Sequence, residues 1–118
     1  MADWGIFMGF GFPVRGREQQ ASQVFGEAME LWGRLQQQGE LESFEAFFLE
    51  PHGGDLGGFF LLRGEQDALG RLRASDEFQR LTTRAQLIVE NFGVVGAATG
   101  DLVAQQMQLF LEAAGELA

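Results

Sequence analysis

The sequence predicts a single mixed α+β domain over residues 1–118, with elements in the order β-α-β-β-α-β followed by a C-terminal helix. Three observations lead to this order. Residues 4–12 alternate large and small side chains, as a half-buried strand does. Residues 17–38 and 75–90 repeat apolar positions at steps of three and four, which is typical of amphipathic helices. A glycine-rich turn at 51–57 separates two apolar runs, which favours a hairpin.

The first strand is expected from Trp4 to Phe12, and Pro13 to Gly16 ends it. One of its faces carries large side chains and the other carries mostly glycine. The large face comprises Trp4, Ile6, Met8, Phe10 and Phe12, and the other comprises Gly5, Phe7, Gly9 and Gly11. Because glycine weakens a strand unless something approaches closely, we expect a neighbour against the glycine face.

A helix is expected next, from about Arg17 to Gln38, with Gly39 after its C-terminal end. The second strand is expected over Glu42 to Glu50, a hairpin loop over 51–57, and the third strand over Gly58 to Arg63. The hairpin therefore places two apolar runs side by side.

The second half continues with two helical pieces. Glu65 to Arg73 is the first, and the second begins after Ser75, a favourable cap, and is expected to reach about Glu90. Phe92 to Thr99 is the expected fourth strand, and Asp101 opens the last helix. Residues 1–99 thus have the split β-α-β order of the ferredoxin-like fold, with a four-stranded antiparallel sheet, and residues 100–118 add a helix.

Composition excludes several classes of function. Eight basic against 17 acidic side chains give a formal charge of −9, which repels phosphate backbones and anionic lipids, so we expect no nucleic-acid partner and no membrane contact. With no cysteine and one histidine, we expect no metal, and the glycine spacing does not suit a dinucleotide, so no cofactor is expected. No basic N-terminal region or apolar run of ~18 residues is present, so a cytoplasmic location is the expectation.

The chain resembles the dimeric α+β barrel superfamily of ferredoxin-like proteins, which includes YCII-related proteins and antibiotic-biosynthesis monooxygenases, and it looks closest to an uncharacterised bacterial group. The resemblance is carried by the segments 16–18, 42–44, 49–59, 63–64 and 92–95. It implies a homodimer that binds a small organic molecule, with a cofactor-independent monooxygenase or isomerase as the possible enzymatic forms. YCII-related proteins have an early histidine and haem-binding relatives a helical one. Here His52 in the expected hairpin loop is the only histidine, so those activities are not carried over.

His52 and Asp55 in the hairpin loop are the candidate catalytic pair, because an aspartate can orient a histidine for proton transfer. In the ferredoxin-like topology this loop shares a sheet end with Arg15, Arg17 and Asn91, which we expect as ligand-binding residues. The alternative, which we favour, is that His52 and Asp55 hydrogen-bond the backbone of their own turn.

The mixed face of the hairpin holds the remaining candidates for ligand binding. If Leu49 lies opposite Phe59, then Glu45 meets Arg63, as an interface ion pair or as a substrate contact. The aromatic rings of Phe7, Phe47 and Phe59 share this face.

Two functions follow. The first is a homodimer that binds a small apolar or aromatic molecule, and the second is a non-catalytic dimerisation or accessory module. An open pocket lined by Phe7, Phe47 and Phe59 would favour the first function. A space that these rings fill would favour the second.

Overall fold

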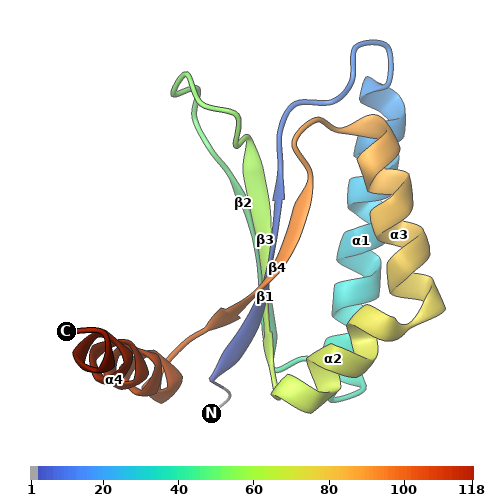
Figure 1. Ribbon diagram of the computed structural model, residues 1–118. Coiled ribbons are helices and arrows are strands. Elements are labelled where there is room, and N and C mark those ends of the chain that lie inside the picture. The colour runs from blue at the N-terminus through green and yellow to red at the C-terminus, as the bar shows by residue number, and fades with distance from the viewer. Residues whose placement is uncertain (1–2) are drawn as a thin grey trace.

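The computed structural model describes residues 3–118 and contains the expected order of elements (Figure 1). Every strand and helix that the sequence predicts is present, with boundaries that differ by a few residues. The elements are β1 (Trp4–Phe10), α1 (Glu18–Gln37), β2 (Ser43–Phe48), β3 (Gly58–Gly64), α2 (Gln66–Ala74), α3 (Asp76–Ile88), β4 (Gly93–Ala98) and α4 (Asp101–Glu116).

The four strands form one antiparallel sheet in the order β2-β3-β1-β4. Helices α1 and α3 lie side by side over one face of this sheet, and α2 connects β3 to α3 at one end (Figure 1). We call the face that α1 and α3 cover the helix face and the other the open face. Helix α4 leaves β4 on the side of the open face.

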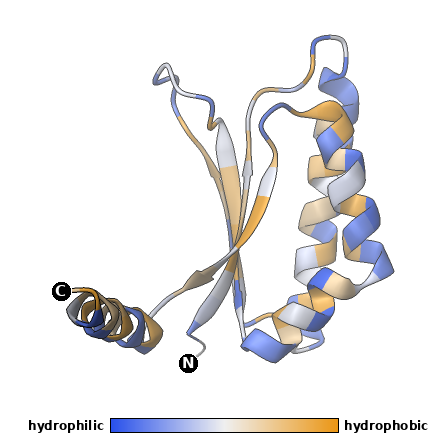
Figure 2. Ribbon diagram, viewed as in Figure 1, coloured by the Kyte–Doolittle hydropathy of each residue, from blue (hydrophilic) through white to orange (hydrophobic). Residues whose placement is uncertain are grey.

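The core lies between the helix face and the helices. Alternate residues of β1 and β3 point toward α1 and α3, and the helices direct apolar residues at steps of three and four toward the sheet. Trp32 of α1 and Leu62 of β3 are completely buried. In Figure 2 the hydrophilic colour of α1 and α3 lies mainly on the side away from the sheet, so the sequence pattern and the layers agree.

The first strand ends at Phe10, two residues earlier than the sequence predicts. The chain then bends toward the helices, and the segment 11–14 pairs with the segment 88–90. The amide of Gly11 donates to the carbonyl of Glu90 at 2.7 Å, and the amide of Glu90 donates to the carbonyl of Phe12 at 2.9 Å. This pairing ends α3 at Ile88 rather than Glu90, and it leaves Phe12, expected on the buried face, 65% exposed.

The β2–β3 register also differs from the expectation, by two residues. Phe47 lies opposite Phe59, Glu45 opposite Leu61, and Arg63 opposite Ser43. The faces are unchanged because a shift of two keeps the side-chain alternation. The predicted pairing of Glu45 with Arg63 is therefore wrong, and no ion pair joins these two residues in the part of the chain that the structure describes.

The neighbours of the glycine-rich face of β1 belong to the same chain. A Cβ on Gly11 would lie 2.7 Å from the carbonyl oxygen of Glu90 and 2.9 Å from that of Asp55. A Cβ on Gly9 would meet the ring of Phe7 at 2.9 Å and the Leu56 side chain at 3.1 Å. Gly11 thus allows close packing of the hairpin loop and the segment after α3 within one protomer, and these two segments are neighbours of the kind expected against the glycine face.

Candidate functional site

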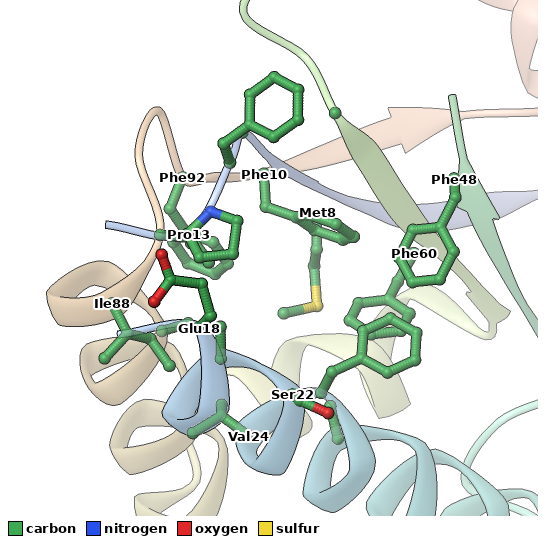
Figure 3. Close-up of a pocket in the computed structure, with 18 of the residues that line it drawn as sticks. Met8, Phe10, Pro13, Glu18, Ser22, Val24, Phe48, Phe60, Ile88 and Phe92 are labelled. Carbon is green, nitrogen blue, oxygen red and sulfur yellow. The ribbon is translucent and has the colours of Figure 1, made fainter. Parts of the chain in front are cut away.

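A cavity of about 560 Å³ lies between the helix face of the sheet and helices α1 and α3, at the end where β1 leaves the sheet. Figure 3 shows Met8, Phe10 and Phe60 from the sheet, Val24 from α1 and Ile88 from α3 around it. Apart from Glu18 and Ser22, all the lining residues are apolar or glycine. Its volume falls within the range of ordinary small-molecule pockets, about 300–1,000 Å³.

Phenylalanine rings form one wall of this cavity. The rings of Phe25 and Phe60 are stacked with centroids 5.0 Å apart, and the ring of Phe25 lies 5.1 Å from that of Phe48. Phe10 lies 5.7 Å from Phe60 and meets Phe48 edge-on at 6.3 Å. Phe48 is 73% exposed, so the aromatic surface continues from the core to the mouth of the cavity.

The polar side chains of the cavity come from the first turns of α1. Glu18 and Ser22 lie four residues apart and therefore on one side of the helix. The carboxylate of Glu18 accepts a hydrogen bond from the amide of Gly16 at 3.2 Å through Oε2. This bond holds the carboxylate at the N-terminal end of α1, where a negative charge is favourable.

An ion pair joins helices α1 and α3. Arg84 of α3 donates to Glu27 of α1 in a bidentate arrangement, at 2.7 Å to Oε1 and 3.1 Å to Oε2. The hydrogen bond from Arg84 lowers the pKa of the Glu27 carboxyl, and the charge of the guanidinium acts in the same direction. Arg34 of α1 and Glu77 of α3 form a second pair further along the helices.

His52 binds the backbone of its own loop on both sides of its ring. Nδ1 accepts a hydrogen bond from the amide of Gly54 at 3.2 Å, and Nε2 donates to the carbonyl of Leu56 at 2.7 Å. A carbonyl can only accept, which assigns the proton to Nε2. No hydrogen bond joins the side chains of His52 and Asp55 in residues 3–118. The ring therefore has the structural contacts that the turn interpretation expects, and a catalytic role stays a prediction.

The other candidates at this sheet end lie on separate segments. Arg15 lies in the turn before α1, Arg17 is the residue before the first turn of that helix, and both are exposed. Asn91 lies between α3 and β4 with a φ of 56°. Figure 1 shows the β1–α1 loop turning toward the helices and the hairpin loop turning away from them. These residues share one end of the sheet, and among the described residues no hydrogen bond or ion pair connects Arg15, Arg17 or Asn91 with the His52 loop.

The aromatic candidates gather on the open face. Phe47 stacks on Phe59 with centroids 4.6 Å apart, and Phe59 lies 4.9 Å from Phe7. Glu45 and Arg63 occupy the same face, in different rows of the sheet. None of these five residues lines the cavity, which lies on the other side of the sheet.

Sequence reasoning therefore missed the residues around the cavity. Phe10, Phe25, Phe48 and Phe60 follow strand or helix periodicity, and a cavity wall shows the same periodicity as a filled core. One available signal was the cluster Phe10-x-Phe12-Pro13, which carries more apolar surface at the end of a strand than a core needs.

Within residues 3–118, no three histidine, cysteine, aspartate or glutamate side chains gather as a metal site would require. Over the same residues, every helix is too short or too polar to span a lipid bilayer.

No family model matches the sequence, and no curated protein is similar to it. Solved structures are similar in fold. A dimeric ferredoxin-like protein of unknown function from Jannaschia sp. CCS1 shares 17% identity, with 81% of this chain and 99% of that chain covered and a TM-score of 0.62. A dimeric ferredoxin-like protein of unknown function from Thermobifida fusca shares 11% identity, with 83% and 92% covered and a TM-score of 0.63.

A third similar structure is SnoaB from Streptomyces nogalater, a cofactor-independent oxygenase. It shares 16% identity, with 84% of this chain and 95% of that chain covered and a TM-score of 0.53. At these identities the likeness concerns the backbone. The four-stranded antiparallel sheet, the helices on one of its faces and these neighbours together establish that the chain has a ferredoxin-like fold.

Proposed function

We propose that the protein is a homodimer in which each protomer binds a small apolar or aromatic molecule in the cavity between the helix face and helices α1 and α3. The observation that carries this proposal is the cavity itself. It has about 560 Å³ of space, and only Glu18 and Ser22 among its lining residues are polar. Removing an apolar molecule from water into such a space is favourable by about 25 cal/mol per Å² of buried surface.

The rings of Phe10, Phe25 and Phe60 favour a flat ligand. Offset stacking and edge contacts between aromatic groups add stabilisation beyond the buried area, and the wall already uses both arrangements. The carboxylate of Glu18 favours a hydroxyl or amine on one end of the ligand, since a carboxylate accepts hydrogen bonds. The class of ligand is thus an aromatic or alicyclic molecule with a single hydrogen-bond donor.

The homodimer rests on the open face. Phe7, Phe47, Phe59, Leu61 and Val95 share this face, and residues 3–118 place no helix over it. Contiguous apolar patches of this kind mark interaction surfaces in proteins that are otherwise polar outside. The description of two similar structures as dimeric supports the same conclusion.

A cofactor-independent monooxygenase or isomerase is the enzymatic form of this proposal. Its support is the backbone similarity to SnoaB, which is described as a cofactor-independent oxygenase. In this chain Glu18 is the group at the cavity with the chemistry to accept a proton from a bound ligand. The alternative is a non-catalytic dimerisation module, which the filled arrangement of Phe7, Phe47 and Phe59 supports for the open face.

Cavity filling tests the proposal. Ser22→Phe places a ring at the cavity from an exposed helical position, and Gln23→Phe places the same ring on an exposed position of α1 outside the cavity. A thermal-shift screen of small aromatic and alicyclic molecules should find compounds that raise the Tm of the wild type and of Gln23→Phe but not of Ser22→Phe. A compound at a hundred times its Kd adds about 2.7 kcal/mol of stability, which is several degrees.

Two results would contradict the proposal. A library that stabilises none of the three proteins leaves the cavity without a ligand of the stated class. Compounds that stabilise all three proteins equally bind elsewhere. Glu18→Gln then tests the polar end of the cavity, because the glutamine amide keeps the shape of the glutamate side chain and removes its charge.

A further inference from the structure

Helix α4 carries an apolar surface that its own protomer leaves uncovered. No residue of α4 is buried, and apart from the half-buried Leu102 its large apolar side chains are 50% to 65% exposed. With 3.6 residues per turn, the apolar side chains occupy most of the circumference, and the polar ones other than Gln106 gather on the remaining strip. The apolar residues are Leu102, Val103, Met107, Leu109, Phe110 and Leu111, with Leu117 just after the helix, and the polar strip comprises Asp101, Gln105, Gln108, Glu112 and Glu116. A helix of this pattern needs a partner surface.

The junction between β4 and α4 directs the helix away from its own core. The amide of Thr99 donates to the carbonyl of Asp3 at 2.9 Å, which ties the end of β4 to the start of β1. Gly100 then adopts a φ of 56°, and a Cβ there would lie 2.7 Å from Oδ1 of Asp3. Val103 donates to the carbonyl of Gly100 at 3.1 Å, so the helix starts immediately. This fixed turn sends α4 out on the side of the open face (Figures 1 and 2).

We infer that α4 of each protomer packs against the open face of a second copy of the chain, so that the two helices are exchanged in the dimer. This inference rests on the homodimer proposed above and names the element that completes its interface. Both uncovered apolar surfaces of the protomer, α4 and the open face, lie on the same side of the sheet. A twofold arrangement brings each helix to the other copy's sheet and covers both surfaces at once.

Charge argues against a lipid surface as the partner of α4. The charged residues of α4 are Asp101, Glu112 and Glu116, with no basic residue among them, and the whole chain has a formal charge of −9. Helices that lie on membranes carry lysine and arginine on their polar strip, because the leaflet is anionic. The acidic strip instead suits a position facing water at the edge of a protein interface.

The similar structures leave a part of this chain without a counterpart. The matches cover 92–99% of the three neighbours and 81–84% of this chain, and the unmatched share has the size of residues 100–118.

Sedimentation equilibrium tests the inference on the full chain. Phe110→Ser removes the central ring of the apolar surface of α4, and Gln108→Ser makes a matched change on its polar strip. Because Phe110 is 65% exposed in the protomer, neither variant should alter the fold, which circular dichroism checks. We expect the Kd of the dimer to rise at least about tenfold for Phe110→Ser and to stay unchanged for Gln108→Ser.

The outcomes separate the two proposals. A wild-type protein that is monomeric at micromolar concentration contradicts the homodimer and the inference together. A wild-type dimer whose Kd is the same in Phe110→Ser contradicts the exchanged helix alone and leaves the dimer standing.

Disulfide cross-linking tests where the helix packs. The chain has no cysteine, so every disulfide must come from the introduced residues. Met107→Cys and Val95→Cys are made in separate chains, and one of the two chains carries a tag that increases its mass. If α4 packs on the open face of the second copy, oxidation of the mixture should give a disulfide-linked dimer of one tagged and one untagged chain. The double variant carries both cysteines in one chain. If α4 folds back on its own sheet, this variant forms an internal disulfide at monomer mass, and the inference fails.

Discussion

The two faces of the sheet use the same residue type for different purposes. On the helix face, Phe10 and Phe60 pack against one another and against Phe25 of α1, and a cavity lies beside them. On the open face, Phe7, Phe47 and Phe59 stack along three neighbouring strands and do not line this cavity. The difference comes from the layer above each face. Helices α1 and α3 cover the rings of the helix face, whereas no helix of residues 3–118 covers the rings of the open face. Phenylalanine at strand spacing thus predicts a face, and the layer above decides whether that face borders a cavity or stays uncovered in the protomer.

The largest expected effect comes from comparing alanine variants of two neighbouring phenylalanines that lie on opposite faces of the sheet. Phe60→Ala should lower the free energy of unfolding by about 4 kcal/mol, because it removes a buried ring in contact with Phe25 and Trp32. Phe59→Ala should cost the protomer clearly less and weaken the dimer instead. Urea denaturation and sedimentation equilibrium measure the two effects. Equal losses of stability for both variants would remove the distinction between the faces.

A second comparison uses two glycines. Gly11→Val should lower the free energy of unfolding by about 3 kcal/mol, since its Cβ would meet the backbone carbonyls of Asp55 and Glu90, which cannot yield as a side chain can. Gly93→Val is the matched control, because a Cβ there meets nothing within 4 Å. Its stability should stay within about 0.5 kcal/mol of the wild type. Chemical denaturation measures both, and a tolerated Gly11→Val would show that the hairpin loop is not held at this position.

The hairpin loop should give a smaller effect. His52→Ala removes two hydrogen bonds to the amide of Gly54 and the carbonyl of Leu56, and should lower stability by about 1 kcal/mol. Asp55→Ala is the control, expected to change stability by less than about 0.5 kcal/mol. The thermal-shift compounds found for the cavity should bind both variants. Normal stability of His52→Ala together with lost ligand binding or turnover would instead support the catalytic interpretation of His52 and Asp55.

The smallest effect concerns the ion pair that joins α1 to α3. The pKa of Glu27 is lowered in the folded protein by the hydrogen bond from Arg84, so the pair stabilises the fold at neutral pH. This contribution is present above the pKa of the unfolded chain and is lost as the pH falls through the lower pKa of the folded state, below about pH 4.5. The difference in urea midpoint between wild type and Arg84→Gln should therefore be seen at pH 7 and decrease as the pH falls below about 4.5. Arg15→Gln, which changes an exposed arginine in a turn, should show no such pH-dependent difference, and a difference for Arg84→Gln that does not decrease in acid would assign the effect to packing.

Periodicity was enough to predict the order of the elements and the faces of the strands. It was not enough for the ends of β1 and α3, because the pairing of Gly11 with Glu90 is a contact between distant segments. The hairpin register shifted by two residues for a similar reason. The amide of Leu49 donates to the carbonyl of Gly57 at 2.9 Å, and this contact sets the loop length and therefore the pairing of Phe47 with Phe59.

The periodicity of the sequence could not predict the cavity. Its volume depends on how far α1 and α3 stand from the sheet, and that distance follows from side chains on three layers at once. The spacing of Phe25 in the helix and of Phe60 in the strand is the same whether the space between them is filled or empty. Besides the Phe10-x-Phe12-Pro13 cluster, the carboxylate of Glu18, four residues from Ser22 on the side of α1 that lines the cavity, distinguishes this helix end from a plain core helix.

The pairing of the segment 11–14 with the segment 88–90 sets how a ligand would enter and leave. These hydrogen bonds, together with that from the amide of Val14 to the carbonyl of Ile88 at 2.8 Å, fix the backbone along one wall of the mouth. The parts of the mouth that remain free to move are side chains, above all the exposed rings of Phe12 and Phe48. Rotations of exposed side chains take picoseconds to nanoseconds, whereas loop opening takes microseconds or longer. A ligand should then bind and dissociate without waiting for a loop to open, so stopped-flow binding should show no slow opening step.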